Sequence, residues 1–142
     1  KVQENFDKAM MLPAKVQLKI YFVYQAWNVF DVARLIHWLD TNQTRRVDFV
    51  PIFLEHPDHL HSCVWPRETQ HYIIGQLLTI ETVRHRDPVQ RIINYTQNTN
   101  KYSVENLQRM KQFIDINDRY RKYKFADVFP KLNYILEESC KT

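Results

Sequence analysis

Six consecutive residues in the C-terminal half of the chain carry its strongest chemical signal, because four are cations and two are tyrosines. They are Arg119, Tyr120, Arg121, Lys122, Tyr123 and Lys124. Cations neutralise phosphate groups, and tyrosines stack on bases or hydrogen-bond to a nucleic-acid backbone. A second cluster comprises Arg84, Arg86 and Arg91, beside His85, and a third comprises Arg45 and Arg46. We predict that the first two clusters form one surface that binds nucleic acid or an acidic partner.

A simpler interpretation of the same residues stays open. Cations at a helix end complement the helix dipole, and in that case Tyr120 and Tyr123 pack against the core. The charge is nevertheless uneven along the chain. Residues 1–71 carry eight basic and eight acidic side chains, whereas residues 72–142 carry twelve basic and eight acidic ones. The whole net charge of +4 therefore lies in the second half, which favours an anionic partner there.

A histidine-rich segment is the next group with ligand chemistry. It contains donors of the kind that bind zinc tetrahedrally, namely His59, His61, Cys63 and His71. Their spacing matches none of the usual zinc patterns, and structural zinc sites more often use paired cysteines. We therefore predict no metal site and expect these histidines to be solvated.

The motifs of common enzymes are missing from the sequence. There is no Gly-x-Ser-x-Gly, no His-Glu-x-x-His and no phosphate-binding loop, which needs more glycines than Gly75 alone. Cys63 has histidines nearby in sequence, but a nucleophilic cysteine also needs a base and an oxyanion hole placed in space. Glu68 and His71 would share a helix face, where an ion pair explains them. We predict a protein that is not an enzyme and holds no cofactor.

Three tryptophans are candidates for a protein interface: Trp27, Trp38 and Trp65. Tryptophan is a favoured anchor residue in protein interfaces. The alternative is that the core of a helical domain of this size buries most of them.

The two cysteines, Cys63 and Cys140, bear on the cellular compartment. Free thiols in a reducing compartment are favoured, and a secreted helical ligand with a Cys63–Cys140 bridge is the alternative. No run of 18 apolar residues and no secretory signal pattern is present. We expect an intracellular, nuclear protein whose partners are other protein subunits, nucleic acid or a second copy of the chain, and not a membrane.

The scarcity of glycine guides the prediction of the fold. One glycine in 142 residues contrasts with the roughly ten expected at about 7 %, and tight β-hairpins depend on glycine. We predict an all-α fold, a single-domain irregular bundle of seven to eight helices over residues 1–142, as a fragment of a longer protein. Besides one helix from residue 15 onward, helices are expected at residues 2–10, 32–39, 46–55, 66–86, 89–98, 104–116 and 125–138.

Residues 15–22 are where the helical interpretation is weakest. Polar and apolar side chains alternate over these eight residues, which is a strand pattern. An isolated strand cannot satisfy its own backbone, and no partner strand is evident. We therefore favour a helix, whose spacing also fits Val16, Ile20, Val23, Tyr24 and Trp27.

A further pattern is Leu12-Pro13, followed after twenty residues by Arg34-Leu35-Ile36-His37-Trp38. Over residues 12–55 the chain resembles the first cyclin-like fold of the TBP-associated, TFIIB-related factors of RNA polymerase I. The resemblance places Phe49, Val50, Phe53 and Glu55 in an aromatic helix. It departs from the family in the loop, where a glycine is typical and this chain has Asn42, Arg45 and Arg46.

The resemblance implies a helical domain that contacts promoter DNA and the polymerase machinery and has no catalytic role. Together with the basic clusters, it leads us to expect a non-enzymatic recognition module in a nuclear or RNA-related assembly such as transcription. A purely protein–protein scaffold or dimerisation domain is the alternative.

Overall fold

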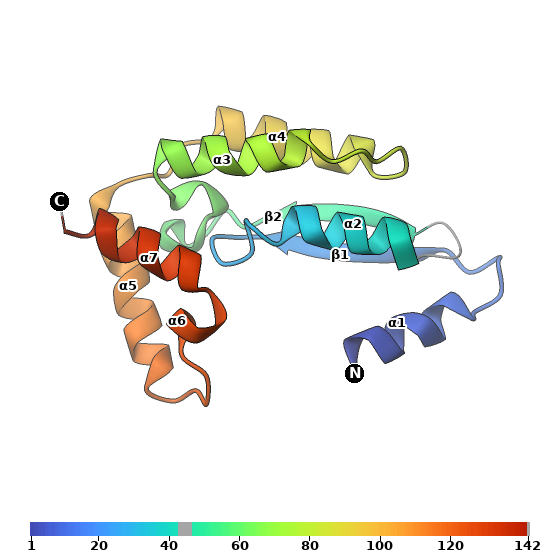
Figure 1. Ribbon diagram of the computed structural model, residues 1–142, viewed down its shortest axis with the longest axis horizontal. Helices are drawn as coiled ribbons and strands as arrows, with labels where there is room; N and C mark the ends of the chain where they lie inside the picture. The colour runs from blue at the N-terminus through green and yellow to red at the C-terminus, as the bar shows by residue number, and fades with distance from the viewer. Residues whose placement is uncertain (43–46, 142) are drawn as a thin grey trace.

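The computed structural model describes residues 1–42 and 47–141. Over this part of the chain it contains seven α-helices, two β-strands and two short 3-10 helices. The prediction of an all-α fold is wrong, because the two strands form a parallel sheet (Figure 1). The fold is mixed α/β, although most of its residues are helical.

A β–α–β unit organises the N-terminal half. Strand β1 (Leu18–Tyr24), helix α2 (Val32–Asn42) and strand β2 (Val47–Phe53) follow one another along the chain. The strands pair in parallel, from Leu18 opposite Val47 to Tyr24 opposite Phe53. Parallel strands need a long crossover connection, and the segment that contains α2 provides it.

The prediction of a helix from residue 15 is wrong, because the alternating segment does have a partner strand. That partner, residues 47–53, is nearly continuously apolar, a pattern shared by short buried helices and by strands of parallel sheets. The predicted helix at residues 46–55 is also wrong over its described part, because residues 47–53 form strand β2. Pro51 lies in β2 opposite Phe22, where it is tolerated because β2 pairs with one strand among the described residues.

The two faces of the sheet differ. One face carries Phe22, Tyr24 and Phe49, which belong to the core or pack against it. The other carries the pairs Tyr21–Val50 and Val23–Ile52, in which Tyr21, Val23 and Ile52 are exposed. Parallel sheets are normally covered on both faces, so this uncovered apolar face is unusual.

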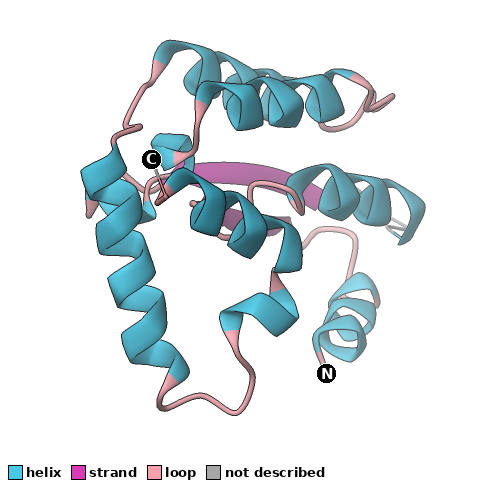
Figure 2. Cartoon of the chain, turned by 60° about the vertical axis from the view of Figure 1, so that its left-hand side comes forward, coloured by secondary structure: helices cyan, strands magenta, loops and turns pink. Residues whose placement is uncertain are grey.

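Helices α2, α3 (Arg67–Leu78) and α4 (Arg86–Asn98) supply much of the core on the buried side (Figure 2). The predicted helix 66–86 ends early, at Leu78, where the hydroxyl of Thr79 hydrogen-bonds to the Gln76 carbonyl. Helix α4 begins at Arg86, so Pro88 lies in its first turn, where a missing N–H costs nothing. Gly75 lies inside α3, and no atom crowds the place of a Cβ there.

Three helices form the C-terminal arm, residues 104–139. Helix α5 (Val104–Asp118) begins after Ser103, which caps it: the Ser103 hydroxyl accepts the Asn106 N–H at 3.0 Å. The predicted helix 125–138 is split into α6 (Phe125–Val128) and α7 (Pro130–Ser139). Pro130 explains the break, because proline starts a helix readily and continues one poorly.

The N-terminal helix α1 (Val2–Met10) lies where the sequence predicted it and contacts α2 through the rings of Phe6 and Trp38, 4.7 Å apart.

No helix in residues 1–42 or 47–141 combines the length and the apolar character that crossing a membrane requires.

Candidate functional site

The six-residue basic segment forms a loop between α5 and α6, which we call the basic turn (residues 119–124). All six side chains are exposed, Tyr120 at 86 % and Tyr123 at 63 %. The simpler interpretation needed both tyrosines to pack against the core, and they do not. Exposed aromatic rings interleaved with cations are the arrangement that binds bases and phosphates together.

The base of the turn is held by hydrogen bonds that leave most of its cations unpaired. The Asp118 carboxylate accepts the N–H of Phe125 at 3.0 Å, and the ammonium of Lys124 bonds to the Asp118 carbonyl. Within the described part of the chain, the following cations of the turn form no ion pair: Arg119, Arg121 and Lys122. The Lys122 ammonium lies 5.3 Å from the centroid of the Tyr123 ring, and no carboxylate has to be displaced from any of the three cations by a ligand.

The second cluster, which we call the α4 cluster, comprises Arg84, Arg86 and Arg91. Arg84 precedes α4 and the other two lie on it, and all three are exposed. The turn between α3 and α4 lies at the opposite end of the molecule from the basic turn (Figures 1 and 2). The structure therefore does not bring the two clusters into one surface, and the third cluster, Arg45 and Arg46, lies outside the described residues.

The three tryptophans have different environments. Trp65 is fully buried, and its indole N–H donates to the Ala26 carbonyl at 2.9 Å, so its position leaves nothing for an interface to contact. Trp38 is half-buried against Phe6. Trp27 is half-buried and packs edge-on against Phe113 and Phe125.

The four potential zinc donors do not converge. His59 packs near the ring of Phe113, His71 is exposed on α3, and Cys63 and His61 are buried. Among residues 1–42 and 47–141, no group of three or more metal-ligating side chains is assembled.

His61 instead belongs to a hydrogen-bonded chain with Tyr95 and Glu55. Its Nδ1 accepts the Cys63 N–H at 3.0 Å, so the ring proton lies on Nε2, which donates to the Tyr95 hydroxyl at 2.7 Å. The Tyr95 hydroxyl donates in turn to Glu55 Oε1 at 2.9 Å. Burial lowers the pKa of His61, which keeps the imidazole neutral and preserves this direction of donation.

The cysteines give no sign of nucleophilic chemistry. Burial raises the pKa of the Cys63 thiol to about 11, so the thiolate is scarce near neutral pH. Cys63 and Cys140 are both free thiols, and the alternative of a bridge between them is not found in this structure.

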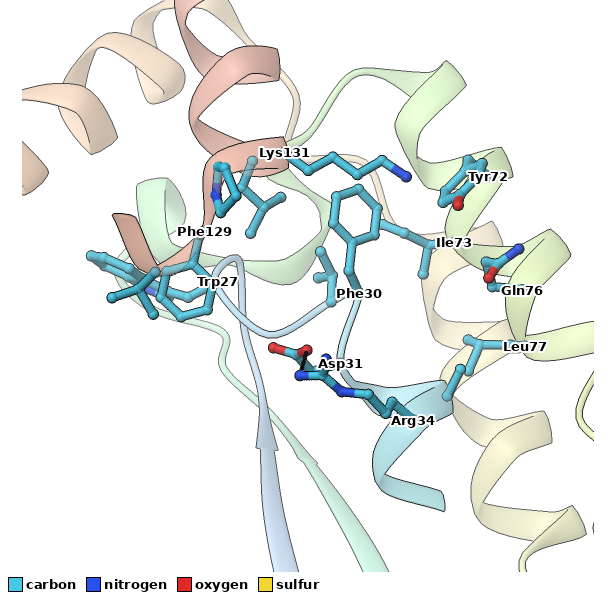
Figure 3. Close-up of a pocket in the computed structure, with 15 residues that line it drawn as sticks. Trp27, Phe30, Asp31, Arg34, Tyr72, Ile73, Gln76, Leu77, Phe129 and Lys131 are labelled. Carbon is cyan, nitrogen blue, oxygen red and sulfur yellow. Dashed lines mark hydrogen bonds and ion pairs between the residues drawn. The ribbon is translucent and has the colours of Figure 1, made fainter. Parts of the chain in front are cut away.

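A pocket of about 440 Å³ lies just past the carboxyl end of β1, between the loop before α2, helix α3 and the α6–α7 junction (Figure 3). We call it the aromatic pocket, because four rings line it: Trp27, Phe30, Tyr72 and Phe129. In open α/β sheets, ligands usually bind in the crevice at the carboxyl ends of the strands. No pattern in the sequence predicted this pocket, because its residues come from three distant segments.

Two cations border the aromatic pocket. The Lys131 ammonium lies 3.8 Å from the centroid of the Tyr72 ring and 4.7 Å from that of Phe30. Arg34 forms an exposed ion pair with Asp31 at 2.8 Å. Within the described chain Lys131 forms no ion pair, and its exposed ammonium lies against two ring faces.

Comparison with protein-family models, curated proteins and solved structures gives no match to this chain. The resemblance to the RNA polymerase I factors therefore gains no support and stays a prediction. The aromatic helix that it implied over residues 49–55 is absent, since Phe49, Val50 and Phe53 lie in strand β2.

Proposed function

We propose that this chain is a non-enzymatic recognition module that binds single-stranded nucleic acid through the basic turn. One observation carries the proposal: Tyr120 and Tyr123 are exposed between cations that have no acidic partner in the described chain. An unpaired cation gains more from a phosphate than a paired one, because no existing ion pair has to be broken. Exposed rings add stacking that tolerates any base.

A single strand is the favoured form, because it presents base faces that a duplex hides. The basic turn is a loop, and neither a helix nor a two-stranded ribbon is available there to enter a major groove. The α4 cluster lies at the opposite end of the molecule from the basic turn, so it serves as an internal comparison for it (Figure 1).

The test compares two double charge reversals. Arg121→Glu/Lys122→Glu alters the basic turn, and Arg84→Glu/Arg86→Glu alters the α4 cluster, and each takes the formal net charge from +4 to 0. We expect the first variant to bind a labelled dT12 oligonucleotide about tenfold more weakly in fluorescence polarisation. The slope of log binding constant against log salt concentration should become shallower by about 1.4, because two phosphate contacts are lost and each contact to a single strand contributes about 0.7.

The variant of the α4 cluster controls for long-range charge. Equal losses in both variants would show a general effect of net charge and would sink the assignment to the basic turn. Unchanged binding in Arg121→Glu/Lys122→Glu would do the same.

A protein–protein scaffold is the second candidate, and the uncovered apolar face of the sheet favours it. Tyr21, Val23 and Ile52 are exposed there, where a parallel sheet normally has a cover. Sedimentation of the chain alone tests it. A dimer that dissociates in Val23→Lys but not in Val83→Lys, which alters an exposed valine outside the sheet, would support the scaffold. A monomer at high concentration would exclude self-association.

A further inference from the structure

The aromatic pocket adjoins the basic turn. A smaller groove of about 310 Å³ is lined by Arg121, Lys122, Tyr123 and Lys124 together with three residues of α6 and its C-terminal end. Two of those residues, Val128 and Phe129, also line the aromatic pocket. The two hollows are therefore neighbours that share part of α6 and the residue that follows it.

We propose that the aromatic pocket binds one base of the nucleic acid whose neighbouring phosphates lie on the basic turn. This inference rests on the proposed function and deepens it by assigning the site of base recognition. The occupant is a nucleotide, which carries a planar ring and an anionic group, the two features that the pocket complements.

The rings and the cation of the pocket match those two features. Phe30 and Tyr72 stand edge to face, with centroids 5.7 Å apart, beneath the Lys131 ammonium (Figure 3). A base can pack against such rings, and Lys131 can leave the ring faces for a phosphate, since it gives up no carboxylate in doing so. Gln76 also lines the pocket and offers an amide donor and acceptor for a base edge.

The size of the pocket also agrees with a base. A volume of about 440 Å³ lies within the range of about 300–1,000 Å³ that small-molecule sites occupy. A single nucleotide fits this space, whereas the side of a folded protein does not. The half-buried rings of Trp27, Phe30 and Phe129 provide the apolar lining that such sites share.

The experiment separates bases from phosphates. Binding by the 142-residue chain is measured for three probes: labelled dT12, an abasic 12-mer with the same phosphates, and thymidine 5′-monophosphate. We expect dT12 to bind about tenfold more tightly than the abasic strand, since stacking of one base accounts for roughly 5- to 100-fold. Tyr72→Ala should remove most of that advantage and leave the abasic strand unaffected. Lys131→Met should weaken the binding of both strands, because both carry the phosphate that Lys131 contacts.

Two exposed positions provide matched controls. Tyr134→Ala removes an exposed tyrosine of α7 outside the pocket, and Lys15→Met removes an exposed lysine near β1. Neither should change the ratio between dT12 and the abasic strand. Tyr72 and Lys131 are themselves exposed, so their variants should fold, which thermal unfolding checks.

Each outcome decides between the two proposals. Equal binding of dT12 and the abasic strand by the wild-type chain overturns the base site and the stacking on Tyr120 and Tyr123, and leaves only the phosphate contacts of the basic turn standing. If the abasic strand does not bind but the monophosphate does, and Lys131→Met abolishes it, the pocket stands as a free-nucleotide site and the function of the basic turn falls. Absence of binding by all three probes overturns both.

Discussion

Near the carboxyl end of β2 the buried His61 is hydrogen-bonded to neighbouring side chains, whereas in the C-terminal arm the cations of the basic turn face solvent. His61, Tyr95 and Glu55 form a chain of hydrogen bonds at the carboxyl end of β2. Arg119, Arg121 and Lys122 have no comparable partners in the described chain. Both regions are rich in aromatic and titratable residues, so composition alone does not distinguish them.

This contrast indicates where a ligand should bind. Polar groups that are satisfied inside the protein contribute to stability, and a ligand would have to displace those bonds to use them. Cations that are exposed to water and form no ion pair remain able to bind an anionic ligand. Substitutions in the first region should therefore change unfolding, and those in the second should change ligand binding.

The largest effect on stability is expected at Trp65. Trp65→Ala removes the largest fully buried side chain and its hydrogen bond to Ala26, and should lower the free energy of unfolding by about 3–5 kcal/mol. Urea unfolding followed by far-UV circular dichroism measures this. A loss below about 1 kcal/mol would contradict the assignment of Trp65 to the core rather than to an interface.

A smaller loss is expected at Tyr95. Tyr95→Phe leaves the Nε2–H of the buried His61 without its acceptor, which should cost about 1–3 kcal/mol in urea unfolding. Tyr24→Phe is the matched comparison. It removes a longer contact of 3.4 Å to Thr96, whose hydroxyl keeps its bond to the Ile92 carbonyl. A greater loss of unfolding free energy in Tyr24→Phe than in Tyr95→Phe would show that the hydrogen bond between Tyr95 and His61 contributes less to stability than the contact between Tyr24 and Thr96.

Acid should weaken the same region. Burial lowers the pKa values of His61 and His85 below 6.5, outweighing the opposing effects of Glu55 and Asp40. The unfolded chain therefore binds protons more readily, so the stability is present above pH 6.5 and is lost as the pH falls through the folded-state values. We expect the urea midpoint to drop between about pH 7.5 and about pH 5.5, and a constant or rising midpoint would contradict the buried, neutral state of these histidines.

The smallest effect on stability is expected in the basic turn. Tyr120→Ala changes a side chain that is 86 % exposed, so the free energy of unfolding should stay within about 0.5 kcal/mol of wild type. Binding of dT12 should nevertheless weaken through the loss of stacking. A loss in the free energy of unfolding well above that margin would show that Tyr120 contributes to stability. The basic turn would then not be a region that affects binding alone.

Local signals in the sequence predicted some of the helices closely. Residues 2–10 form α1 and α5 follows Ser103, because caps and apolar spacing act over one or two turns of chain. The break at Pro130 between α6 and α7 was not predicted. The alternation in residues 15–22 was also a true strand signal. The helical interpretation was preferred because the partner strand, residues 47–53, does not alternate in sequence. Pairing between strands about 30 residues apart produces no pattern within either segment by itself.

Sequence alone established that residues 119–124 form a dense group of cations and tyrosines and that no enzyme motif is present. Only the folded chain exposes this group, puts the α4 cluster at the other end of the molecule and buries Trp65. Folding also assembles the aromatic pocket from Trp27, Tyr72 and Lys131. Residue type and short spacing are properties of the chain itself, whereas burial and proximity depend on contacts between segments far apart in it.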